Sequence, residues 1–268
     1  MTRVPVLLYH SISGRPPPFI ARFAVTPAEF ERHLDLAAER RCTALTVSAF
    51  ADVLRGRTPL PPRALVITFD DGLADFPAAA LPALQARRLP ATLYVPTGLL
   101  RGSPQRVHLA SVGDALLDWS QLAELDAAGI EVGAHSHTHP HLDTLRTAAA
   151  RDEIRRSKAL LEDELGHDVR TFAYPNGYSS PRVRRLVSEA GFGSACAVKN
   201  AFSSPADDPL AIARLMLTSE TTVEDVRAWL DGTGAPDAPR QDAPATRAWR
   251  AYRRARALAR GRPGSDLT

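Results

Sequence analysis

Two clusters of polar residues in this sequence carry side chains that bind metal ions and transfer protons. The first is the adjacent pair Asp70 and Asp71, followed by Gly72. Two neighbouring carboxylates are costly to hold together unless a cation compensates them, and such a cation binds one carboxylate while the other acts as a base. The alternative is an ordinary polar turn, because Asp-Gly is a common turn signal.

The second cluster places four of the chain's eight histidines within seven residues, at positions 135, 137, 139 and 141. Neutral imidazole is a common ligand for zinc and similar metals. An extended segment would let all four side chains converge, whereas a helical turn would pair His135 with His139. Pro140 disfavours a continuing strand. An exposed polar loop is the alternative, and it explains one histidine better than four.

Asp71, His135 and His139 together form a ligand set of two histidines and one carboxylate, which leaves coordination positions open for water. This is the ligand set of a catalytic rather than a structural metal. A third imidazole would displace that water, so we interpret His137 and His141 as residues around the site or in solvent.

The elements that must position these residues are short apolar runs that alternate with longer amphipathic stretches. The runs are at 4–9, 65–69, 91–95, 130–134, 171–174, 194–198 and 211–217. Several are continuously apolar, which is typical of strands covered on both faces. Helices are predicted from the Thr26 capping box onward and at 77–88, 120–128, 148–165, 181–190 and 223–231.

About seven strand-then-helix units predict an α/β fold in which a parallel sheet is closed, or nearly closed, into a barrel. Both polar clusters directly follow apolar runs, and the C-terminal ends of strands are where such barrels carry their chemistry. We expect a catalytic domain over residues 1–232. Residues 233–268 are predicted to be a Pro/Gly-rich linker and a basic, Arg-rich tail.

The net charge of +3 is unevenly distributed along the chain. Residues 243–268 hold seven arginines and one acid, a net of +6, so the first 242 residues carry −3. An acidic body argues against specific nucleic-acid binding. The tail can form a helix over 246–262, but its arginines fall on nearly every face. We therefore expect a disordered arm, in weak electrostatic contact with a membrane or an acidic partner.

The location of the protein is expected to be cytoplasmic. The first apolar run covers only residues 4–9 and contains Pro5. It is too short for the apolar core of a signal peptide and for a membrane span.

The motifs resemble those of the NodB-like polysaccharide deacetylases, the fourth carbohydrate-esterase family. Thr-Phe-Asp-Asp-Gly at 68–72 and His-Ser-x-x-His-Pro at 135–140 are similar to the first two motifs of that family. Further similar segments are Val-Leu-Leu-Tyr-His at 6–10, Ala-Thr-Leu-Tyr-Val at 91–95 and Phe-Ala-Tyr-Pro-Asn-Gly at 172–177. The resemblance covers about residues 4–217.

The resemblance implies a distorted (β/α) barrel, the NodB-homology fold, that hydrolyses an N-acetyl group on a sugar. A divalent metal would be bound by Asp71, His135 and His139, with zinc as the first choice and cobalt or nickel as alternatives. Asp70 would be the general base, and a backbone N–H near Asn176 would help to stabilise the oxyanion. Tyr174, in the same segment, is a candidate substrate contact.

Two departures from the family pattern concern the base and the acid. The third motif here, Ala-Tyr-Pro-Asn-Gly at 173–177, lacks the arginine that normally orients the base, and Arg214 is a candidate to replace it. The late Leu-x-His motif is also missing, since no histidine follows His167. Leu8-Tyr9-His10 supplies the same pattern at the N-terminus, as in permuted family members, so His10 is the predicted general acid.

The expected substrate is an N-acetylated amino sugar in a polysaccharide, an oligosaccharide or a glycosylated metabolite. The altered third motif leaves open hydrolysis of a C–N amide bond on a non-sugar substrate. A catalytically inactive carbohydrate-binding protein is a further alternative, although the base, the ligands and an acid are all present. The tail lies outside the resemblance, and we expect it to be dispensable for catalysis.

Overall fold

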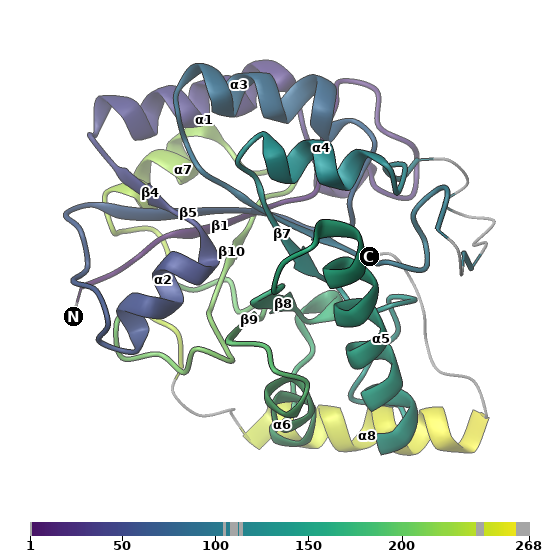
Figure 1. Cartoon of the computed structure of the whole chain (residues 1–268). Helices are drawn as coiled ribbons and strands as arrows, with labels where there is room; N and C mark the ends of the chain where they lie inside the picture. The colour runs from purple at the N-terminus through teal and green to yellow at the C-terminus, as the bar shows by residue number, and fades with distance from the viewer. Residues whose placement is uncertain (1, 104–105, 108–111, 113–114, 240–243, 261–268) are drawn as a thin grey trace.

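The computed structural model describes residues 2–103, 106–107, 112, 115–239 and 244–260. Its centre is a parallel sheet with strands in the order β10-β1-β5-β6-β7-β8-β9 and with β4 paired to β5 outside this path (Figure 1). The strands are β1 (Val6–Tyr9), β4 (Thr43–Leu45), β5 (Ala64–Phe69), β6 (Thr92–Val95), β7 (Glu131–Ala134), β8 (Thr171–Ala173), β9 (Ser194–Cys196) and β10 (Leu215–Met216). Each of the seven predicted apolar runs overlaps one of the seven strands in this order.

The sheet curls into a half-barrel whose two edges are tied together. A parallel bridge joins Cys196 at the end of β9 to Ile212, three residues before β10. The N–H of Ala197 donates to the carbonyl of Ile212 at 2.8 Å. These contacts confirm the predicted α/β fold with a distorted barrel of about seven strands.

Helices cover the outside of the sheet and close one end of the barrel. They are α1 (Pro27–Glu39), α2 (Val47–Leu54), α3 (Leu81–Ala86), α4 (Gln121–Ala127), α5 (Thr147–Leu165), α6 (Pro181–Glu189), α7 (Val223–Leu230) and α8 (Pro244–Arg260). Short pieces are β2 (Ser11–Ile12), β3 (Ala24–Val25), η1 (Ala21–Phe23), η2 (Phe76–Ala80) and η3 (Pro175–Gly177). In the part of the chain that the structure describes, no helix combines the length and the apolar composition needed to cross a membrane.

Local sequence explains where most of these helices begin and end. Thr26 accepts a hydrogen bond from the N–H of Glu29, whose carboxylate accepts one from the N–H of Thr26, so the predicted capping box opens α1. The single helix predicted at 77–88 is instead a π-helical turn, η2, followed by α3. Pro82 lies inside the predicted helix and lacks the N–H group that a regular helix would need there.

The apolar core has two parts, one on each side of the sheet. The larger part lies between the sheet and the outer helices. The smaller part fills the barrel interior with side chains such as Val6, Val66, Tyr94 and Cys196, and α2 packs against it through Phe50. This interior packing holds the strand ends in fixed positions.

The segment after residue 232 is attached to the body, which differs from the expected loose linker. Asp237 forms a bridge with Phe202 and accepts hydrogen bonds from Arg3. The expectation of a disordered arm is wrong for residues 244–260, which form helix α8, drawn in yellow in Figure 1. The physical reason is that one of its arginines, Arg253, lies against a buried carboxylate and an aromatic ring. Residues 261–268 lie outside the described residues.

Gly133 on β7 provides a test of the barrel interior. An added Cβ there would lie 2.5 Å from a ring carbon of Tyr94 and 2.9 Å from Cγ2 of Thr171. We expect Gly133→Ala to lower the free energy of unfolding by about 1–3 kcal/mol, as overpacking does. The control is Gly14→Ala, where the added Cβ meets no described atom within 4 Å. Equal denaturant midpoints for the two variants would contradict this packing.

Candidate metal centre

The candidate site lies at the C-terminal ends of neighbouring parallel strands. His10 follows β1, Asp70 and Asp71 follow β5, and His135 follows β7. Because the strands are parallel, these ends meet at one edge of the barrel. The structure therefore brings together the two polar clusters and His10, which lie far apart in the sequence.

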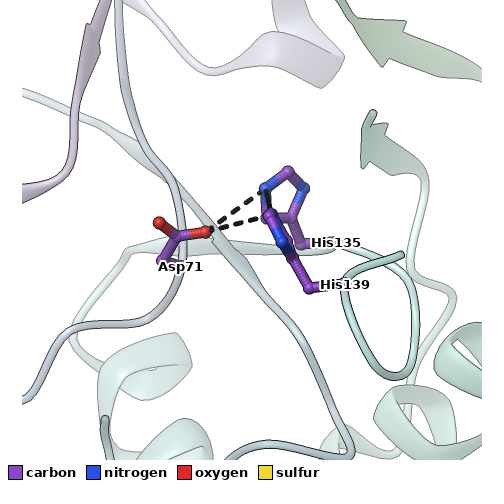
Figure 2. A group of neighbouring side chains, drawn as sticks. All are labelled: Asp71, His135 and His139. Carbon is purple, nitrogen blue, oxygen red and sulfur yellow. Dashed lines mark hydrogen bonds and ion pairs between the residues drawn. The ribbon is translucent and has the colours of Figure 1, made fainter. Parts of the chain in front are cut away.

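Asp71, His135 and His139 form one compact group of buried ligand atoms (Figure 2). The Oδ1 atom of Asp71 lies 3.5 Å from Nε2 of His135 and 3.4 Å from Nε2 of His139. The two Nε2 atoms are 3.2 Å apart. His135 Nδ1 lies 2.8 Å from the carbonyl of Ala173, which orients the ring so that Nε2 is the atom directed at Asp71.

These atoms fit a divalent metal by spacing and by chemistry. Tetrahedral bonds of 2.0–2.2 Å place neighbouring ligand atoms about 3.3–3.6 Å apart, close to the three separations observed here. The Oδ1 atom of Asp71 is buried and accepts no hydrogen bond from the described residues. Burial and the neighbouring charge of Asp70 raise the pKa of Asp71, opposed by Arg214. A cation would remove this electrostatic cost.

Asp70 is held by a bidentate ion pair with Arg214, and both side chains are buried. Arg214 donates from Nη1 to Oδ1 at 2.6 Å and from Nη2 to Oδ2 at 2.7 Å. Burial alone would raise the pKa of Asp70, but the charge and hydrogen bonds of Arg214 outweigh it and lower that pKa to about 2. The carboxylate therefore stays ionised near neutral pH.

Arg214 reaches Asp70 from inside the barrel rather than from the end of a strand. It directly precedes β10, and its side chain lies next to the Tyr94 ring and near the carbonyl of Ala197. Arg214 was predicted only as a candidate to replace the missing arginine of the third motif. It is a buried cation whose guanidinium extends to the site from within the core.

His10 lies in the same cavity as the metal-ligand group and packs against Phe23, with ring centroids 5.1 Å apart. Its Nδ1 atom is buried and has no hydrogen-bond partner among the described residues. Burial lowers the pKa of the His10 imidazole to about 4, against the opposing charge of Asp70. His10 is therefore neutral near pH 7 in this arrangement.

The cavity has a volume of about 310 Å³. Its lining consists of His10, Phe23, Asp70, Asp71, His135, His139, His141, Asn176, Gly177, Tyr178, Val198 and Met216. It contains the predicted base, ligands and acid, which supports a single reaction centre. Phe23, Tyr178, Val198 and Met216 were not predicted as site residues, because none of them lies in a distinctive motif.

The turn at 175–177 places Asn176 and Gly177 in the cavity wall. Asn176 has φ 53°, and its Oδ1 atom is buried without a partner in the described chain. Gly177 has φ 70°, and a Cβ there would lie 2.5 Å from Cβ of Val198, so only glycine fits. The proposed substrate contact by Tyr174 is not supported, because its hydroxyl donates to the carbonyl of Leu210 outside the cavity lining.

Left-handed backbone conformations gather at this site. Asp71 and His139 have φ values of 71° and 57°, in addition to Asn176. Non-glycine residues in this region are strained and persist where the surrounding structure imposes them. Here the strain positions ligand and wall residues. His137 points elsewhere, with Nδ1 2.9 Å from Oγ1 of Thr97.

Comparison with known proteins gives a family match over more than half of the chain. Residues 57–195 match the family model described as polysaccharide deacetylase. IcaB from Ammonifex degensii is 26% identical, with a TM-score of 0.73 over 85% of this chain and 97% of that one. The deacetylase PplD of Streptococcus pyogenes, solved with acetate, has a TM-score of 0.72 at 23% identity over 84% of this chain and 96% of that one.

Curated relatives align at similar identity. The poly-β-1,6-N-acetyl-D-glucosamine N-deacetylase of Staphylococcus epidermidis is 24% identical over 221 residues, which are 78% of this chain and 73% of that protein. YxkH of Bacillus subtilis is 24% identical over 190 residues, which are 71% of this chain and 62% of that protein. The chain thus spans less than two thirds of the length of YxkH.

If Asp71, His135 and His139 bind the metal, removing one of these side chains should weaken metal binding. We expect His139→Ala to weaken Zn²⁺ binding by more than about 100-fold, because it removes one of three direct ligands. Calorimetric titration of the metal-stripped protein measures this. The control is His167→Ala, since His167 is exposed and paired with Asp126. Zn²⁺ binding that is equal in the two variants would contradict the assignment.

The buried Asp70–Arg214 pair predicts a stability effect that does not depend on activity. Arg214→Gln leaves the Asp70 carboxylate buried without its partner, which costs about 3–5 kcal/mol of unfolding free energy. The double variant Asp70→Asn with Arg214→Gln removes that charge and should regain part of the loss. Denaturant unfolding measures both. If the double variant is no more stable than Arg214→Gln alone, the Asp70 and Arg214 side chains are not energetically coupled.

Proposed function

Because the chain belongs to the polysaccharide deacetylase family, we propose that it is a metal-dependent hydrolase that removes N-acetyl groups from an amino sugar. The observation that carries this proposal is the position of Asp70, fixed by Arg214, beside the Asp71–His135–His139 group in one cavity. A base next to a metal centre is an arrangement that can hydrolyse an unactivated amide.

Asp71, His135 and His139 would hold the metal, with zinc as the first choice and cobalt or nickel as alternatives. When bound, such an ion supplies Lewis-acid chemistry, which polarises a carbonyl oxygen and acidifies water. The protein contributes ligands that are buried and already close together, so little rearrangement accompanies binding.

Asp70 would take the proton of the attacking water. The bidentate contact with Arg214 keeps both carboxylate oxygens in one plane and fixes their direction. It also keeps the carboxylate ionised, as the pKa of about 2 indicates. Arg214 therefore supplies the base-orienting arginine that the third motif lacks, from a different position in the chain.

His10 would return a proton to the leaving amine. It lines the same cavity as Asp70, and its buried Nδ1 has no partner in the described chain. Because the pKa of His10 is about 4, its imidazole is neutral at rest; it would take up the proton that Asp70 removes from the attacking water and pass that proton to the nitrogen of the leaving amine. The backbone N–H of Asn176 would stabilise the oxyanion from the opposite wall.

The substrate class proposed is a carbohydrate that contains N-acetylglucosamine, as in the deacetylase names of the relatives. A polymer, an oligomer and a glycosylated metabolite all present the same acetamido group. The cavity of about 310 Å³ is of the size that holds one sugar residue with its acetyl group.

The test of this function is acetate release from N-acetylglucosamine oligomers by the metal-loaded protein. We expect Asp70→Asn and His10→Ala to lower the turnover number by about 10²–10⁴-fold, the usual contribution of a general base or acid. Zn²⁺ stoichiometry should stay at the wild-type value in both, because neither is a ligand. Wild-type turnover in both variants would refute these roles, and release only from acetylated non-sugar amides would redirect the substrate assignment.

A further inference from the structure

We propose that Arg253 of α8 is a positioning residue of the substrate cavity, through its contacts with Tyr178 and Asp143. The inference rests on the proposed function for its substrate and goes beyond it, because α8 lies outside the residues that match the family. It also changes the expectation that the tail is dispensable. In Figure 1, α8 crosses the end of the molecule that carries α5 and α6.

Arg253 makes two contacts, one with the partly exposed ring of Tyr178 and one with the buried carboxylate of Asp143. Its guanidinium carbon lies 3.5 Å from the centre of the Tyr178 ring. Its Nη1 atom lies 3.3 Å from Oδ2 of Asp143. The side chains of Arg253 and Asp143 are 11% and 2% exposed. The neighbouring Arg254 and Arg256 are exposed, so Arg253 differs from them in being a docked side chain.

Tyr178 connects Arg253 to the cavity. Its ring lines the cavity and meets the His141 ring at 80°, with centroids 5.4 Å apart. Arg253 covers one ring face, and a cation over an aromatic face is attracted by the ring electrons. The guanidinium and His141 together restrict the ring, which makes Tyr178 a fixed wall for a bound sugar.

Asp143 connects Arg253 to the loop that follows the metal ligands. It lies four residues after His139. Arg182 of α6 holds the same loop through hydrogen bonds from Nη2 to the carbonyls of Leu142, Asp143 and Leu145 at 3.1–3.2 Å. Arg182 thus binds the loop backbone, while Arg253 binds its buried carboxylate.

The contact explains how an arginine-rich helix stays on the protein surface. A buried carboxylate without its cation is strongly unfavourable, so Asp143 favours the docked state of α8. Arg253 does not touch Asp70, His10 or the ligand group. Its loss should therefore act on substrate binding more than on the chemical step.

The kinetic test compares Arg253→Ala with the matched control Arg256→Ala, an exposed arginine on the same helix. With N-acetylglucosamine oligomers, we expect Arg253→Ala to raise KM roughly 2- to 5-fold, the range of a cation–π contact on an exposed ring. The turnover number should change less than about threefold. Arg256→Ala should match the wild type. Equal KM values for the two variants overturn the proposal.

Variants of Tyr178 separate positioning from general stability. Tyr178→Phe keeps the ring and should leave KM within about twofold of the wild type. Tyr178→Ala removes the cavity wall as well as the Arg253 contact, so it should raise KM at least as much as Arg253→Ala, and the double variant should not exceed Tyr178→Ala. Additive effects overturn the coupling. Arg253→Lys, which keeps the charge but not the planar group, should fall between the wild type and Arg253→Ala.

Hydrogen exchange tests the same contact without any substrate. We expect faster amide exchange at 140–146 and 177–180 in Arg253→Ala than in Arg256→Ala or the wild type. If the wild type releases no acetate, the proposed function fails while this comparison still decides the positioning role. Unchanged exchange in both segments overturns it. Arg253→Lys serves as the test variant if Arg253→Ala does not fold.

Discussion

The structure depends on how two adjacent carboxylates are accommodated in a buried position at the end of β5. Asp70 and Asp71 are both almost inaccessible to water, and like charges this close cannot both remain ionised without compensation. The fold compensates them in different ways. Asp70 receives the guanidinium of Arg214 from the barrel interior, whereas the Oδ1 atom of Asp71 faces two imidazoles and accepts no hydrogen bond from the described residues. One carboxylate is thereby suited to accept a proton and the other to bind a cation.

Much of the fold could be predicted because its strands are buried on both faces and read as short apolar runs. Helix α2 was missed, since its eight residues are mostly apolar and too few for periodicity alone to distinguish a helix from a buried strand. The state of α8 could not be predicted from charge alone. An arginine-rich segment is disordered or docked according to whether a buried carboxylate such as Asp143 faces it, and that depends on tertiary structure.

The candidate site was predictable where neighbouring residues in sequence are also neighbours in space. Asp70 with Asp71, and His135 with His139, are close in the chain, and the shared end of parallel strands brings the pairs together. Tyr174 and Tyr178 could not be distinguished from sequence, because the left-handed turn at Asn176 decides which of the two rings faces the cavity. Arg253 carries no local signal, since its partners lie 75 and 110 positions earlier in the chain.

The position of Arg214 links the orientation of Asp70 to the closure of the barrel. The segment that carries it also closes the barrel, through the bridge between Ile212 and Cys196. The chain up to β9 contains Asp70 and the Asp71–His135–His139 group, but it lacks the cation that pairs with Asp70. The residue that orients the Asp70 carboxylate and the segment that joins the two edges of the sheet are therefore one unit of the fold, so a change that opens this edge would also release Asp70.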